Sequence, residues 1–315
     1  MGKVWLLTER IFPVECGGKG HVQDPYPLIA EKTYGKLGRS FISFGINFTL
    51  FGYSTVYLLL AAQNIQILVD HFDKSLSFCY GLLILAGVLL PFSWLGTPKE
   101  PLAVGACLAT GAACVLLIIN MSLHSKDIPD VIHSNPTFTD FSVAFGTIVS
   151  AIAGHPTFPT FQMDMKNQEE FKWAVIIAFI GISLMYLPVT AVGYFVYGNL
   201  LKYNLLQTLP HKETLSVIVQ IAITLHLLLA FLIPLNPVSQ NLESWLKIPN
   251  GFSWRRCFVR TILVALSLFI AESIPHFGAV FSLMGGVYAI LSFVCPCLFY
   301  HKICNMYNQE VLDTM

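Results

Sequence analysis

A short segment rich in glycine, proline and histidine interrupts an apolar stretch of this 315-residue chain. It reads Gly154-His155-Pro156, and Pro159 follows three residues later. Proline removes a backbone donor and glycine lowers helicity, so the sequence predicts a helix that unwinds near 152–156 and resumes near Pro156. The two ends of such a break present carbonyl groups and N–H groups, which can hold a cation and a carboxylate. A plain proline kink is the alternative interpretation.

His155 has three interpretations, because an imidazole inside an apolar segment can act in several ways. It can be a packed residue that forms a hydrogen bond to another helix, a proton carrier, or a contact to a substrate. A second histidine in an apolar stretch, His226, is interpreted as a packing residue. Tyr53 is a polar residue in the first long apolar run. We interpret it as the donor or acceptor of an interhelical hydrogen bond before we consider a ligand contact.

Motifs for other chemistry are missing from the sequence. No apolar stretch contains a pair of carboxylates, and there is no Gly-x-Ser-x-Gly, Walker or His-Glu-x-x-His pattern. The eight cysteines follow neither a disulfide framework nor a metal-knuckle spacing. The sequence therefore predicts no enzyme, no metal and no cofactor, and it leaves transport driven by an ion gradient as the expected function.

The elements around these residues are predicted from where charges are absent. Charged residues make up 11% of the chain and hydrophobic residues 55%, whereas soluble domains are about 25% charged. Zero net charge also argues against nucleic acid as a partner. Long, nearly charge-free runs of about 20 residues are typical of membrane-crossing helices. They predict an all-α, polytopic membrane protein with about eight spans, near 41–68, 75–95, 102–121, 141–162, 173–196, 215–235, 257–273 and 277–300.

The basic residues of the loops predict the orientation in the membrane. With eight spans, only Lys74, Lys126, Lys202 and Lys212 of the 18 lysines and arginines lie on the side away from the termini. Because basic residues collect on the cytoplasmic side, both termini are expected there. The predicted organisation is a cytoplasmic N-terminal segment, 1–40, a transmembrane domain, 41–300, and a cytoplasmic tail, 301–315.

Several segments together resemble a known family. The run from Ala153 to Gln162, followed by Asp164-Met165-Lys166, resembles the sixth-helix signature of the amino acid/auxin permeases. Further similarities lie, in the expected order, at Asp24–Arg39, Pro91–Pro98, Tyr186–Gly198, Asn236–Gln240 and Ile274–Gly278. The animal proton-coupled branch of amino acid transporters is the most similar.

The resemblance implies eleven helices in two inverted five-helix repeats, as in the sodium-coupled leucine transporter, with helices one and six broken around the substrate. The eight spans would then be family helices three to ten, and helices one, two and eleven are expected to be absent. The fold would be a partial version of the repeat architecture. The substrate-contacting residues implied by the resemblance are Ser150, Ile152, Ala153, Gly154 and His155, with Tyr53 and Thr224 as weaker candidates.

Two functions remain open from the sequence. The first is secondary active transport of amino acids by alternating access, with a proton as coupling ion. The second is a truncated isoform that does not transport and pairs with a full-length related transporter. Amino acids, as small-molecule substrates, and the lipid bilayer are the expected partners, and the plasma membrane or a lysosomal or vesicular membrane is the expected location.

Overall fold

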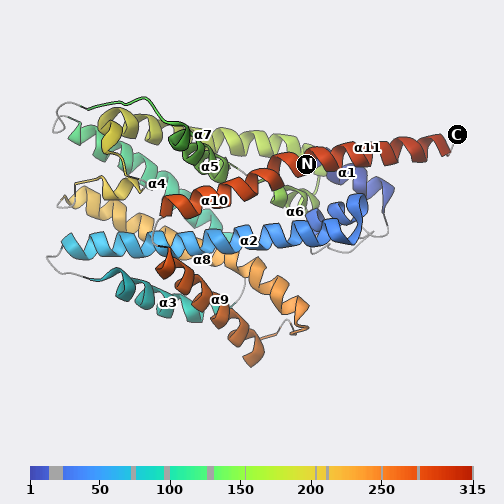
Figure 1. The fold of residues 1–315 in the computed structure, drawn as a ribbon, viewed down its shortest axis with the longest axis horizontal. Coiled ribbons are helices and arrows are strands. Elements are labelled where there is room, and N and C mark those ends of the chain that lie inside the picture. The colour runs from blue at the N-terminus through green and yellow to red at the C-terminus, as the bar shows by residue number, and fades with distance from the viewer. Residues whose placement is uncertain are drawn as a thin grey trace. The chain divides into compact units, whose positions relative to one another are not determined.

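The computed structural model describes residues 1–13, 24–71, 76–95, 100–125, 131–152, 154–202, 204–210, 213–249, 251–274 and 277–313. Within these ranges the regular secondary structure is helical, as Figure 1 shows. The all-α fold class predicted from the sequence is thereby confirmed. Ala153, one of the candidate site residues, lies outside the described ranges.

Eleven α-helices are described along the chain. They are α1 Gly2–Ile11, α2 Pro25–His71, α3 Phe78–Leu95, α4 Glu100–His124, α5 Phe138–Ile152, α6 Phe158–Asp164, α7 Phe171–Tyr197, α8 Thr214–Trp245, α9 Trp254–Ser273, α10 Phe277–Ala289 and α11 Cys295–Asp313. A π-helical segment, Ile290–Val294, joins α10 to α11. The predicted transmembrane domain was 41–300. Helix α2 begins before its first residue and α11 continues past its last residue.

Seven helical segments of the described chain are long and apolar enough to cross a membrane. They correspond to seven of the eight predicted spans, and the chain is a multi-pass integral membrane protein. The remaining predicted span, 257–273, forms most of α9. Helix α9 does not qualify by composition, because its 20 residues include Arg255, Arg256, Arg260 and Glu272.

The sixth predicted span, 215–235, corresponds to α8 but ends about ten residues too early. The helix instead continues through Pro234 and Pro237 to Trp245. Ser239 donates a hydrogen bond from its hydroxyl to the carbonyl of Leu235, at 2.8 Å, which uses a carbonyl in the turn that the prolines disturb. A different interruption occurs in α2, where Gly35 adopts a φ of 72° and so separates 25–34 from the longer helix that follows.

The chain forms two compact units, each described here by itself. The first unit consists of 1–49, 144–182 and 282–315, and the second consists of 50–143 and 183–281. In the first unit, α1 packs against α11, and Trp5 and Tyr26 are fully buried in the core beside Leu291 and Phe299. The first unit contains the helix break predicted near His155.

The second unit is built on contacts of α8 with α4 and of α9 with α3. Its main apolar core includes Leu58, Leu82, Phe231 and Val264. Polar side chains link α4 to α8 at several levels: Asn120 donates to the hydroxyl of Ser216, and His124 pairs with Glu213. Such interhelical polar pairs fix the register of helices whose surfaces are otherwise apolar.

Candidate substrate site at the helix break

The predicted interruption of the fourth span is present. Helix α5 ends at Ile152, residues His155–Thr157 form a single 3-10 turn, and α6 begins at Phe158. Gly154 has a φ of −100° and a ψ of 3°, which is not helical. Pro156 and Pro159 lie at the starts of these two segments, where a missing N–H costs little. The prolines and glycine therefore set both the end of α5 and the start of α6.

Local hydrogen bonds use the backbone groups of the break. The amide of Gly154 donates to the carbonyl of Ile152 at 3.1 Å. The carbonyl of Gly154 accepts from the amide of Thr157 at 3.1 Å and from its hydroxyl at 2.7 Å. A carbonyl oxygen has two lone pairs, so the Ile152 carbonyl can accept one further bond from a ligand.

A second irregular segment contacts this break. The π-helical turn Ile290–Val294 packs against the 3-10 turn His155–Thr157. Pro296 lacks a backbone donor, and the wider turn before it leaves the Leu291 carbonyl available to a side chain. The hydroxyl of Tyr26 donates to this carbonyl, and the Tyr26 ring meets Phe299 edge-on at 5.5 Å.

The His155 ring lies among three phenylalanine rings. Its centroid is 4.9 Å from that of Phe158, 5.2 Å from Phe293 and 6.2 Å from Phe179. These rings come from α6, the π-helical turn and α7. Within the described chain, the buried Nδ1 of His155 has no hydrogen-bond partner. The imidazole is therefore packed against aromatic rings, whose faces attract cations.

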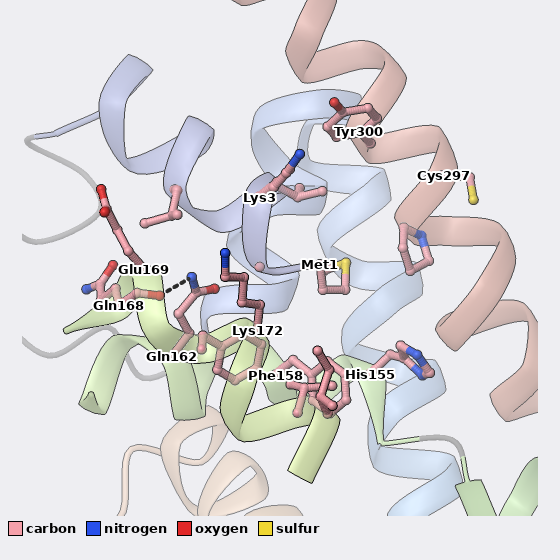
Figure 2. A pocket seen from close by; sticks show the side chains of 17 residues that line it. Met1, Lys3, His155, Phe158, Gln162, Gln168, Glu169, Lys172, Cys297 and Tyr300 are labelled. Carbon is pink, nitrogen blue, oxygen red and sulfur yellow. Dashed lines mark hydrogen bonds between the residues drawn. The ribbon is translucent and has the colours of Figure 1, made fainter. Parts of the chain in front are cut away.

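A cavity of about 830 Å³ opens beside His155 within the first unit. Its size falls in the range of small-molecule sites, roughly 300–1,000 Å³. Figure 2 shows His155 and Phe158 at one end of the pocket and Glu169 at the other, with Lys3 and Lys172 between them. One end is thus aromatic and the other carries both signs of charge, a combination that suits a small zwitterion with an apolar side chain.

Gln162 supplies a buried amide to the wall of this pocket. Its Nε2 donates to the carbonyl of Gln168 at 3.0 Å, a bond drawn in Figure 2. Its Oε1 is buried and has no partner in the described part of the chain. A buried acceptor without a partner is costly, so this oxygen is suited to receive a donor from a ligand.

The predicted site residues belong to both compact units. Among those that the structure describes, His155 is the one that lines the pocket. Ile152 and Gly154 form the break itself, and Ser150 faces α10, where its hydroxyl would lie 2.5 Å from a Cβ added at Gly285. Tyr53 and Thr224 belong to the second unit, where Tyr53 contacts the ring of Phe281 and Thr224 donates to the carbonyl of Gln220 at 2.7 Å.

Other pocket residues were not selected from the sequence. Gln162 is seven residues beyond His155 and is a polar side chain in a charge-free window, a signal that could have identified it. Phe158, the residue directly before Pro159, also lies in the interrupted segment. Lys3, Glu169 and Lys172 carry no distinguishing pattern, because charged residues at span ends are common in membrane proteins.

The fold and this site define a multi-pass membrane protein with a broken helix beside a ligand-sized pocket. A family model described as "transmembrane amino acid transporter protein" matches residues 10–312, and the chain belongs to this family. The finding agrees with the family-level resemblance carried by the Ala153–Gln162 segment. Members similar to this chain are transporters and not enzymes, as the sequence predicts.

Named relatives are known from Arabidopsis thaliana. Amino acid transporter AVT1J is 26% identical over 308 residues, covering 92% of this chain and 71% of the relative. Amino acid transporter AVT1I is 23% identical over 308 residues, covering 92% of this chain and 74% of the relative. Amino acid transporter AVT1C is 26% identical over 282 residues, and there the chain spans half of the relative's length.

Proposed function

We propose that this chain carries out secondary active transport of amino acids, coupled to protons and working by alternating access. The single observation that supports this most is the broken helix between Ile152 and Phe158, which runs beside a pocket of about 830 Å³. Membership of the amino acid transporter family and the names of the relatives support the substrate class.

The pocket's groups suggest how an amino acid would bind. Lys3 and Lys172 are suited to the substrate carboxylate, and Glu169 is suited to its ammonium group. The unpartnered Oε1 of Gln162 would accept a further N–H, and the phenylalanine cluster around His155 would receive an apolar side chain. His155 would carry the coupled proton, because it is the titratable group at the break itself.

Proton-driven uptake by the purified chain in liposomes tests this proposal, with two histidine variants compared. His155→Ala is expected to reduce the initial rate of amino acid uptake under an acid-outside gradient by about tenfold or more, which corresponds to about 1.4 kcal/mol. His226→Ala is the matched control. His226 also lies in a membrane helix, but its Nδ1 is 3.3 Å from the hydroxyl of Thr110 in the second unit.

The measurement uses radiolabelled amino acids from several side-chain classes, with and without the pH gradient. Uptake that is equal in the two histidine variants would contradict the role of His155. Uptake that depends on the pH gradient in neither the parent chain nor the variants would contradict proton coupling. Normal elution of each variant as a single species in size-exclusion chromatography shows that folding is retained.

A second candidate is a non-transporting role, in which the chain pairs with a longer related transporter. The observation behind it is that the chain spans only about half the length of relatives such as AVT1C. Co-expression of differently tagged proteins, followed by pull-down and uptake assays, separates the two candidates. Co-purification with altered uptake by the partner, together with no uptake by the chain alone, would favour this role.

Placement in the animal proton-coupled branch, the partial two-repeat architecture and a plasma, lysosomal or vesicular location are also proposals. The first two follow from the family resemblance as a whole, which runs from about residue 24 to 300. Location can be tested by imaging a tagged chain at native expression.

A further inference from the structure

A second pocket lies in the second unit. It has a volume of about 530 Å³ and is formed where the end of α8 meets the start of α9. Leu242, Leu246, Phe258 and Ile262 give it apolar walls. Among its described lining residues, Arg255 is the one that carries a charge. A cavity with hydrocarbon walls and one cation suits an amphipathic anion.

Exposed tryptophans place this pocket at a membrane surface. Helix α8 is one of the candidate spans and ends at Trp245, and α9 begins at Trp254. The two tryptophans are 68% and 84% exposed, respectively. Trp collects at membrane–water interfaces, where its ring is partly in hydrocarbon and its N–H is partly in water. The mouth of the pocket therefore lies at the depth of lipid headgroups.

Arg255 differs from the arginines next to it. Arg260 is 2% exposed, and its Nε donates to Oε1 of Glu243 at 2.6 Å while its Nη1 donates to the carbonyl of Ser93 at 2.6 Å. The Nε of Arg256 is 3.3 Å from the same Glu243 oxygen. Arg255 is exposed, and it forms no ion pair with the described residues. Among the described residues, Arg256 and Arg260 both pair with Glu243.

The position of Arg255 on its helix is also electrostatically unfavourable. It lies in the first turn of α9, where the helix dipole favours acidic side chains, and that turn contains none. A cation at this end therefore gains little from its own helix, whereas an external anion would be attracted by both the guanidinium and the helix terminus. The apolar pocket beside Arg255 would also take up the hydrocarbon portion of such an anion.

We propose that this pocket binds an anionic phospholipid of the surrounding bilayer. The phosphate pairs with the guanidinium of Arg255, and one acyl chain lies along Leu242, Leu246, Phe258 and Ile262. Since the pocket is formed by both α8 and α9, the bound lipid holds the two helices together and stabilises the second unit. The inference is independent of what the transporter carries.

Thermal unfolding of the purified chain in neutral detergent tests this site. Phosphatidylglycerol, phosphatidylcholine, glycerol phosphate and inorganic phosphate are added separately over a range of concentrations. Phosphatidylglycerol is expected to raise the melting temperature at lower concentration than phosphatidylcholine, and the two soluble phosphates are expected to have no effect. Native mass spectrometry under the same conditions counts the lipids bound.

Three variants complete the test. Arg255→Gln is expected to weaken phosphatidylglycerol binding about fivefold, the effect of one basic residue near a membrane surface, and Arg255→Lys is expected to keep most of it. Lys302→Gln is the matched control, because Lys302 is an exposed cation on α11 in the first unit. Arg255 is exposed, so the substitutions remove no core contact.

Several results would overturn the proposal. These are equal stabilisation by the two phospholipids, full phosphatidylglycerol binding by Arg255→Gln, or the same stabilisation by inorganic phosphate alone. A lipid-free dimer that dissociates on the Arg255→Gln substitution would assign the surface to a second copy of the chain instead.

Discussion

At the scale of single residues, some buried polar side chains have a partner among the described residues and others do not. Asn120 has Ser216 as a partner, and Arg260 has Glu243. The Oε1 of Gln162 and the Nδ1 of His155 are buried without a partner among the described residues. Both belong to residues that line the same pocket. The cost of burying such atoms is tolerated where a substrate satisfies them during function.

One carboxyl outside the membrane segments has an altered acidity. Burial raises the pKa of Asp24 above its usual value, and the positive charge of Arg39 opposes this shift. A carboxyl whose pKa is raised on folding stabilises the fold below its unfolded pKa, and this stabilisation is lost as the pH rises through the folded pKa. The charged form of Asp24 therefore lowers stability at neutral pH.

Asp24→Asn is expected to raise the melting temperature at pH 7, because asparagine removes the buried charge and still caps the helix that starts at Pro25. At about pH 3, Asp24 is mostly protonated in both the folded and the unfolded state. The parent protein and the variant should then unfold at the same temperature. Differential scanning fluorimetry of the detergent-purified proteins across this pH range measures both. A lower melting temperature of the variant at pH 7 would show that pairing with Arg39 outweighs burial.

At the scale of helices, α5 and α10 come into direct backbone contact in the first unit. A Cβ added at Gly285 would lie 1.9 Å from the carbonyl oxygen of Gly146, and one added at Gly146 would lie 2.8 Å from the carbonyl oxygen of Ser282. Small residues allow such close approach in membrane proteins. Gly285 lies at this contact, whereas a Cβ at Gly286 would meet nothing within 4 Å.

Gly285→Ala is therefore expected to force α5 and α10 apart and to destabilise the protein by about 1–3 kcal/mol. The neighbouring Gly286→Ala is the matched control and should be neutral or slightly stabilising, since alanine favours helix more than glycine does. Melting temperatures in detergent separate the two variants. Equal stability of both would mean that the two helices are not held at this distance in the protein.

The helix break could be predicted from the sequence because its causes are local. Pro156, Pro159 and Gly154 act on their own backbone. Their pattern therefore predicts the end of α5 and the start of α6 to within a few residues. The surroundings of His155 could not be predicted, because Phe179 and Phe293 approach it only after folding. The end of α8 was placed about ten residues too early because the local propensity of Pro234 and Pro237 would end a helix, whereas buried residues beyond them, such as Val238 and Ser239, hold the helix in the packed protein.

At the scale of the whole molecule, the number of membrane crossings depends on α9. By composition it does not qualify as a span, because three arginines and a glutamate lie in its 20 residues. A count of charged residues ignores their partners. Within the second unit, Arg260 pairs with Glu243 and donates a hydrogen bond to the Ser93 carbonyl. A buried and paired arginine costs much less in a membrane than a free one, and Arg255 and Arg256 lie in the first turn, within reach of the headgroups.

We therefore expect α9 to cross the membrane, which gives eight crossings and places both termini on one side. The basic residues of the loops put that side in the cytoplasm. Epitope tags at residues 1 and 315, probed with antibody in intact and in permeabilised cells, measure this directly. Both tags should be reached only after permeabilisation. A C-terminal tag that is reached in intact cells while the N-terminal tag is not would mean that the Arg260–Glu243 pair leaves α9 outside the bilayer, and that seven helices cross it.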